Sequence, residues 1–185
     1  GNPCPSARHH HWWQRSRALP AFSLQQSDGT ALTTEDLAGH WTVVFIGFTH
    51  CPDICPTTLA QLASAQKQWA SIPTASRPRV LFISADPERD SPKLTGDYAH
   101  AFHKDTLAAT APLPALEDFA RSLSLVFMKA PGPSGAPDDY SIDHSAALIL
   151  LDPQVRMAGV VQPPFDIKAI ASDLILLSTP TKTTP

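Results

Sequence analysis

The chain is poor in cysteine, in long apolar runs and in basic charge. Its 185 residues include only three cysteines, which excludes a small secreted scaffold held together by many disulfides. No apolar run reaches the roughly 18 residues that a membrane-spanning helix needs, and the first residues lack the pattern of a signal peptide. The formal net charge of −3 provides no basic footprint for nucleic acid, so we expect no nucleic-acid partner.

The composition is that of a folded globular protein. Hydrophobic residues make up 43% and charged residues 17%, and the length is enough for one domain with a sizeable core. We expect this domain to span residues 19–178. Residues 1–18 are predicted to be a flexible leader or a cloning remnant, although the run His9 to His11 is also compatible with a metal-binding tract. Residues 179–185 are predicted to be a flexible tail.

Alternating apolar runs and helical patterns predict an α/β fold. The runs 41–48 and 79–86 are rich in β-branched and aromatic residues and suit strands buried on both faces. Helical spacing follows the first run from Pro56 and returns over 166–178, whereas 145–163 suits a hairpin. Because strands separated by helices pair in parallel, we expect a thioredoxin-like fold with a central mixed sheet flanked by helices.

Turn residues mark two further stretches. Residues 22–33 suit two short strands around an Asp28-Gly29 turn, which predicts an N-terminal hairpin extension of the sheet. Residues 131–144 are rich in proline and glycine and are predicted to be a loop.

The stretch "FTHCPDICPTTLAQL" contains the most informative pair of residues, Cys51 and Cys55. It follows a predicted central strand, at the sheet edge where open α/β folds place their sites. With Pro56 as the first helical residue, the pair lies at a helix entrance, which is expected to lower thiol pKa values. The spacing exceeds the C-x-x-C of disulfide oxidoreductases by one residue, so a redox disulfide, a metal site and simple packing all stay open.

A metal site with two thiolates would need a third ligand, such as an imidazole. The predicted domain contains His40, His50, His100, His103 and His144. Among them His144 is the candidate, because it ends a long loop directly before a buried strand that can pair beside the cysteine strand. Asp143 precedes it and is a candidate to orient its ring from the outer shell.

The stretch "SADPERDSP" follows the second predicted strand. Asp86 lies at the carboxyl end of that strand, so we consider it for an outer-shell role near the thiols. Asp90 or Ser91 is expected to cap the next helix, as in an ordinary strand-to-helix loop.

Three separated motifs, "GFTHCPDICPTTL", "SADPERDSP" and "DYSIDHSAALILLDP", together resemble the Sco (SenC/PrrC) family of copper-binding thioredoxin-fold proteins. The resemblance runs from about residue 19 to residue 177. It implies that Cys51, Cys55 and His144 bind copper, as Cu(I) and in many members also as Cu(II).

The resemblance also implies a function and a location. Members of this family assist assembly of the CuA centre of cytochrome c oxidase, by delivering copper or by reducing the receiving cysteines. The implied partners are the oxidase subunit that carries CuA, and a copper-donor chaperone or a thioredoxin-like reductant. We expect a monomer, not a conventional enzyme, on the periplasmic side of the bacterial inner membrane, with its N-terminal membrane anchor absent from this chain.

Two alternatives use the same cysteines. A thiol–disulfide oxidoreductase, acting on the CuA-site cysteines or in redox signalling, would need only Cys51 and Cys55. A peroxidase of the peroxiredoxin type would need an arginine beside a reactive thiolate, for which Arg89 is the candidate.

Overall fold

The fold is seen in a computed structural model, which describes residues 10–179. These residues form ten strands and five helices, in the order β1 His10–Ala18, β2 Ser23–Gln26, β3 Ala31–Thr33, α1 Thr34–Leu37, β4 Thr42–Gly47, α2 Ile54–Trp69, β5 Arg79–Ser84, α3 Pro92–Phe102, β6 Leu107–Thr110, α4 Leu113–Ser122, β7 Phe127–Pro131, β8 Tyr140–His144, β9 Leu148–Leu151, β10 Arg156–Val161 and α5 Ile167–Ser178. No helix in this part of the chain combines the length and the apolar character needed to cross a membrane.

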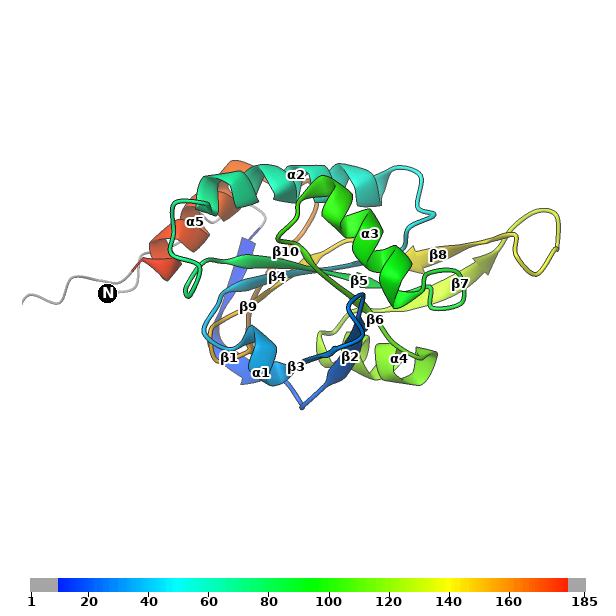
Figure 1. Ribbon diagram of the computed structural model, residues 1–185, viewed down its shortest axis with the longest axis horizontal. Helices are drawn as coiled ribbons and strands as arrows, with labels where there is room; N and C mark the ends of the chain where they lie inside the picture. Colours follow the sequence, from blue (N-terminus) through cyan, green and yellow to red (C-terminus); the bar gives the residue numbers. More distant parts are fainter. Residues whose placement is uncertain (1–9, 180–185) are drawn as a thin grey trace, which may run out of the picture.

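Eight strands form one mixed sheet in the order β1-β10-β9-β4-β5-β6-β2-β3. The centre is parallel, since β5 pairs in the same direction with β4 and with β6, and antiparallel pairing takes over from β4 to β9. Helices α2, α3 and α5 cover one face, and α1 and α4 cover the other (Figure 1). The predicted mixed sheet flanked by helices is confirmed, as is the β2–β3 hairpin, in which Gly29 takes the positive φ that its turn requires.

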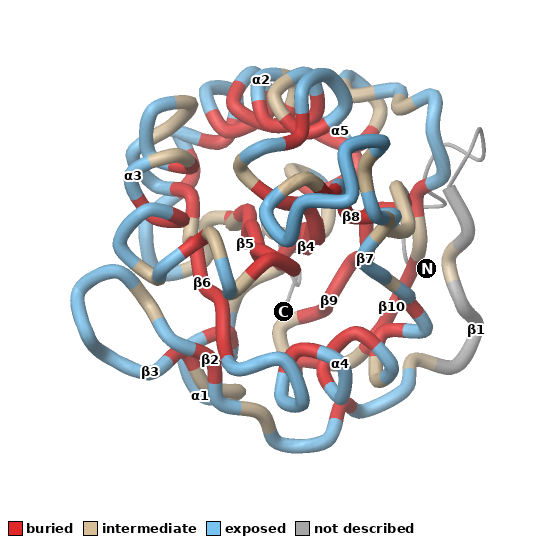
Figure 2. Tube along the Cα trace, turned by 90° about the vertical axis from the view of Figure 1, so that its right-hand side faces the viewer, coloured by how far each residue is buried: buried red, intermediate tan, exposed pale blue. Residues whose placement is uncertain are grey.

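The core follows the central strands. All six residues of β4 are buried, and the apolar side chains of β5 and β9 are buried beside them. Buried residues accordingly concentrate along β4, β5 and β9 between the two helical layers (Figure 2). This placement makes β4 a rigid support for whatever follows its last residue, Gly47.

The N-terminal boundary differs from the prediction. Residues 10–18 were expected in a flexible leader, but they form β1, which pairs antiparallel with β10. A strand that joins a sheet edge through backbone hydrogen bonds needs no apolar pattern, so the composition of this segment did not reveal it. The rest of the predicted leader, residues 1–9 with Cys4 and His9, and residues 180–185 of the predicted tail lie outside the described residues.

Three elements also differ from the prediction. Helix α2 begins at Ile54 rather than Pro56, which is its third residue and still lies among the four whose N–H groups lack helical partners. Residues 140–144 form β8, which pairs with β7 in a separate two-stranded sheet, instead of ending a loop. Strand β6 was not predicted, because its alanine-rich run, Leu107–Thr110, lacks the β-branched pattern of a strand.

Candidate metal centre

The cysteine half of the site lies between the carboxyl end of β4 and the first turn of α2. Cys51 is in the connecting loop with 8% of its surface exposed, and Cys55, the second residue of α2, is fully buried. The backbone N–H of Cys55 donates to the Sγ atom of Cys51 over 3.4 Å. Both cysteines are free thiols. The short loop and the helix start therefore hold the two sulfur atoms close together.

Gly47 provides the space that the Cys55 side chain occupies. A Cβ atom at position 47 would lie 2.6 Å from the Cys55 Sγ atom and 3.1 Å from a ring carbon of Phe82. Real Cβ atoms do not approach sulfur this closely, so any larger residue would displace the thiol. The last residue of β4 thus helps to set the position of Cys55.

The histidine half is carried by β8. The Nε2 atom of His144 lies 3.7 Å from the Cys55 Sγ atom, and the ring packs edge-on against Phe45 and Phe48. Its Nδ1 atom lies 3.1 Å from the Ser145 carbonyl oxygen. Because a carbonyl oxygen can only accept, this hydrogen bond places the ring proton on Nδ1 and leaves the Nε2 lone pair directed at the thiol.

The structure thus brings together three of the predicted site residues. One donor atom each from Cys51, Cys55 and His144 lies within 4.8 Å of the other two. Zinc, for comparison, holds thiolate sulfur at about 2.3 Å and imidazole nitrogen at about 2.0 Å. A single ion can therefore reach all three donor atoms with modest adjustment.

Burial governs the electrostatics of this site. It raises the pKa of the Cys55 thiol far above its ordinary value, so the prediction that the helix entrance would lower it is wrong for Cys55. Burial also lowers the pKa of His144, against smaller opposing effects of the Ser145 carbonyl and the Asp143 charge. At neutral pH the metal-free site therefore presents a protonated Cys55 thiol and a neutral imidazole, and a cation must displace the thiol proton to bind.

The loop after β5, residues 84–91, holds the cysteine loop in place. The Asp90 carboxyl group is fully buried and accepts hydrogen bonds from the Thr49 N–H at 2.9 Å, the Thr49 hydroxyl at 2.5 Å and the Ser84 hydroxyl at 2.6 Å. Ser91 caps α3 by accepting from the Leu94 N–H, as predicted. A capping role for Asp90, however, is wrong, because its carboxyl group anchors the loop that carries Cys51.

The same 84–91 loop also holds the strand that carries His144. Asp86 is buried and accepts from the Tyr140 hydroxyl at 2.6 Å and from Arg89 at 2.5 Å. The Arg89 guanidinium lies 3.7 Å from the centre of the Tyr140 ring and donates to the Tyr140 carbonyl. The Nζ atom of Lys129 lies 4.3 Å from the centre of the same ring and forms an ion pair with Glu88. Arg89 thus contacts Asp86 and Tyr140, and within residues 10–179 no hydrogen bond or ion pair joins it to Cys51 or Cys55, as the peroxidase alternative would need.

The other predicted or considered residues lie apart from the three donors. Asp143 is exposed and influences His144 through its charge, while the hydrogen bond that orients the ring comes from Ser145. His50 is exposed and groups with Asp86 and Asp90 within 4.8 Å, but both carboxyl groups already have the partners described above.

Two tyrosines near the site were not identified from the sequence. Tyr140 had a readable signal, since it alternates with Ile142 and His144 as strand residues of one face do. Tyr98 of α3 had none. Its buried hydroxyl has no hydrogen-bond partner among the described residues, and burial, with smaller contributions from Cys55, Cys51 and Asp90, raises its pKa to about 12. A neutral phenol therefore adjoins the dithiol.

The fold and the site define a thioredoxin-like protein in which a buried dithiol faces an imidazole. The SCO1/SenC family model matches residues 13–177, and the chain belongs to this family.

Comparisons with individual relatives support this family assignment. The chain is 32% identical over 158 residues to a Stutzerimonas stutzeri protein described as copper-binding, covering 84% of this chain and 74% of that one. It is 32% identical over 157 residues to the mitochondrial SCO1 homolog 1 of Arabidopsis thaliana, covering 83% of this chain but 45% of the relative, about half its length. The structure of Arabidopsis thaliana ScoI with copper bound aligns with a TM-score of 0.76 at 31% identity, covering 86% of this chain and 96% of that one.

Proposed function

We propose that this protein is a copper metallochaperone, which binds one copper ion through Cys51, Cys55 and His144. The observation that carries the proposal is the convergence of the three donor atoms within 4.8 Å. Family membership and the copper bound by the Arabidopsis thaliana relative support the choice of metal. Thiolate and imidazole donors suit Cu(I), and the imidazole also suits Cu(II).

The arrangement suits a metal that must be handed on. His144 is half-buried and Cys51 keeps 8% of its surface exposed, whereas Cys55 is fully buried. A partner can therefore approach the copper from the side of Cys51 and His144 and replace its ligands one at a time. We propose that the recipient is the cytochrome c oxidase subunit that carries the CuA site, with copper supplied by a donor chaperone, and that the protein acts as a monomer on the periplasmic side of the bacterial inner membrane.

Outer residues then tune the ligand positions. We assign Asp86 to positioning His144 through Tyr140, because Tyr140 and His144 belong to the same five-residue strand. Asp143 contributes charge near the ring without a hydrogen bond to it. This division gives the two predicted outer-shell carboxylates different tasks.

A second candidate function, thiol–disulfide exchange on the CuA-site cysteines, is favoured by the proximity of the two free sulfurs, of which Cys51 keeps 8% of its surface exposed and Cys55 none. The Cys51 thiolate would attack a disulfide sulfur of the partner, releasing one partner thiolate and forming a mixed disulfide. Cys55, after losing its proton, would attack Cys51 and release the second partner thiolate. Two electrons pass to the partner, and a thioredoxin-like reductant would regenerate the dithiol.

A Cu(I) titration of the reduced protein against a chromogenic chelator tests the metallochaperone. We expect one copper per chain, and we expect His144→Ala to weaken binding by more than about tenfold, because even the loss of an outer-shell partner costs that much at metal sites. His50→Ala is the matched control, since this exposed histidine adjoins Cys51 but lies outside the donor group. Unchanged copper affinity in His144→Ala, with dithiol exchange retained, would instead support the second candidate.

A further inference from the structure

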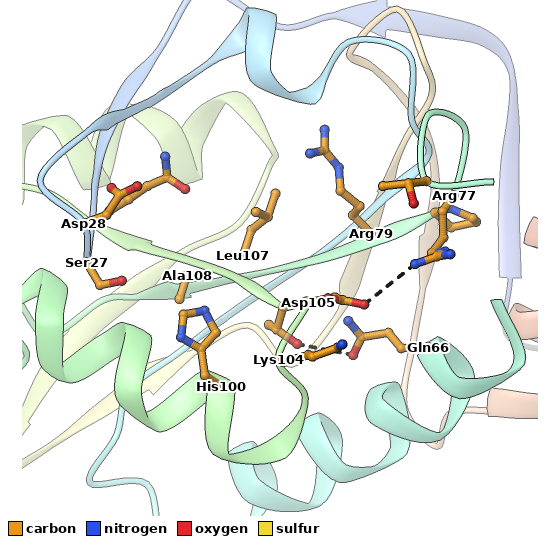
Figure 3. Close-up of a pocket in the computed structure, with 14 residues that line it drawn as sticks. Ser27, Asp28, Gln66, Arg77, Arg79, His100, Lys104, Asp105, Leu107 and Ala108 are labelled. Carbon is orange, nitrogen blue, oxygen red and sulfur yellow. Dashed lines mark hydrogen bonds and ion pairs between the residues drawn. The ribbon is translucent and has the colours of Figure 1, made fainter. Parts of the chain in front are cut away.

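A cavity of about 430 Å³ lies where the parallel strands β5 and β6 begin, at the end of the sheet opposite the thiols. It lies beside Arg79 and Leu107, the first residues of β5 and β6, whereas Cys51 follows the last residue of the parallel strand β4. A six-residue strand spans about 20 Å, so a ligand here would not touch the dithiol. Figure 3 shows Gln66, Lys104 and His100 on one side of the cavity and Arg79 on the other, with Leu107 and Ala108 between them.

The cavity carries positive charge on an acidic chain. Its lining includes three cations, Arg77, Arg79 and Lys104, and two carboxylates, Asp28 and Asp105, which gives +3 − 2 = +1 with histidine neutral. The whole chain has a net charge of −3. Local charge therefore favours an anionic ligand over a cation.

Both carboxylates and one of the cations already have partners. Asp28 accepts from the N–H and the hydroxyl of Thr30, and Asp105 forms an ion pair with Arg77 at 3.9 Å. Arg77 also donates to the Ala70 carbonyl, which lies at the carboxyl end of α2, and so offsets the negative potential of that helix end.

The remaining donors have unused capacity. Lys104 has no hydrogen bond or ion pair within residues 10–179, and the buried Nε atom of Arg79 has no partner there. The Arg79 guanidinium also donates to the Asp36 carbonyl and is influenced by the negative charge of the Asp36 side chain. Gln66, only 5% exposed, uses its Oε1 atom to accept from Thr106 and has no partner for its amide nitrogen. The Gln66 amide and the Lys104 ammonium therefore lie on one side of the cavity with unused donors (Figure 3).

Part of the lining is apolar. Leu107 and Ala108 contribute carbon surface between the polar groups (Figure 3), and Pro78 also lines the cavity. A bare inorganic ion would leave this surface in contact with water, whereas a ligand with a compact apolar group would cover it.

We propose that this cavity binds a small organic anion, consisting of a phosphate or carboxylate group attached to a compact apolar group. The anionic group binds to Lys104 and to the amide nitrogen of Gln66, which lie on the same side of the cavity (Figure 3), and the apolar group packs on Leu107 and Ala108. This site is separate from the proposed copper site and does not depend on it.

Phenyl phosphate and benzoate are the probes, because both carry one anionic group on a ring and they distinguish phosphate from carboxylate. Each is titrated into the reduced full chain while backbone amide NMR signals are followed. We expect saturable shifts centred on residues 104–108 with one probe or both, and no such shifts with phenol, which lacks the charge. Absence of saturable shifts with both anions at millimolar concentration would overturn the proposal.

Lys104→Gln is the decisive variant, since an exposed side chain without partners can be changed without harm to the fold. We expect it to weaken probe binding by about tenfold, the effect of losing one charge-assisted hydrogen bond. The matched control is Lys93→Gln, which removes an equal charge from α3, where Lys93 pairs with Asp97 away from the cavity. Equal loss in both variants would indicate a nonspecific effect of net charge and would contradict the site.

Discussion

The two halves of the candidate metal centre are supported very differently. Cys51 and Cys55 lie at the end of β4, in the middle of an eight-stranded sheet, and under helix α2. His144 lies on β8, which pairs with β7 in a separate sheet of two strands. Beside it, Val126 is 74% and Met128 65% exposed.

This difference indicates that the cysteines form a fixed half of the site, whereas the position of His144 can adjust and forms the adjustable half. Isolated two-stranded hairpins are only marginally stable, so the position of His144 depends on contacts outside its own sheet. The 84–91 loop provides such a contact, because Asp86 accepts a hydrogen bond from Tyr140 on β8. Asp90 of the same loop accepts hydrogen bonds from Thr49 in the cysteine loop. One loop thus sets the relative position of the two halves, and its two carboxyl groups can be tested separately.

The largest effect is expected from Asp90→Ala, on the fixed half. The change removes a buried carboxyl group that accepts three hydrogen bonds. The Thr49 N–H and the Ser84 hydroxyl then lose their acceptor. Buried groups deprived of a charged partner cost on the order of 3 kcal/mol or more in the free energy of unfolding. Urea denaturation of the reduced, metal-free protein measures this loss.

Asp97→Ala is the control for that change. Within the described part of the chain its carboxyl group pairs with Lys93, and both side chains are largely exposed, so the loss should stay below about 1 kcal/mol. Similar losses in the two variants would show that the Asp90 contacts do not support the cysteine loop.

A smaller effect is expected from Gly47→Ala, which acts mainly on Cys55 and also crowds the Phe82 ring. The added methyl group would lie 2.6 Å from the Cys55 Sγ atom, and overpacking of this kind costs about 1–3 kcal/mol. We also expect copper affinity to fall as the sulfur moves away from His144. The double variant Gly47→Ala/Cys55→Ala should be less destabilised than the sum of the single variants, because the clash is gone. Strict additivity would contradict the steric argument.

The sequence predicted the fixed half better than the adjustable half, for a physical reason. The apolar run before Cys51 and the helical spacing after Pro56 are local patterns. Each of them indicates which of its own residues are buried. The three-motif resemblance then pointed to His144, and the structure places its Nε2 atom 3.7 Å from Cys55. The residue pattern alone did not show whether the segment before β9 reaches the thiols.

The contacts that hold His144 were missed because they join residues far apart in the chain. Asp86 and Tyr140 are 54 positions apart, and nothing in either local pattern links them. The proline- and glycine-rich composition around residues 131–139 also masked the alternation that begins at Tyr140. Likewise, the expected lowering of the Cys55 pKa came from the helix start alone, whereas burial by the folded core dominates.

The smallest effect is expected from Tyr140→Phe, on the adjustable half. The ring and its packing against Arg89 are retained, while Asp86 loses the hydroxyl that donates at 2.6 Å. An acceptor left unsatisfied in this way costs about 1–2 kcal/mol, and we expect faster hydrogen exchange of the β8 amides together with weaker copper binding. The only other tyrosine of the sequence supplies the control, because the Tyr98 hydroxyl has no partner among residues 10–179 and Tyr98→Phe should leave the β8 amides unchanged. If β8 exchange in Tyr140→Phe matched that of the unmodified protein, the Asp86 contact would not position His144, and the two halves would have to be held together by the packing of the ring against Phe45 and Phe48 instead.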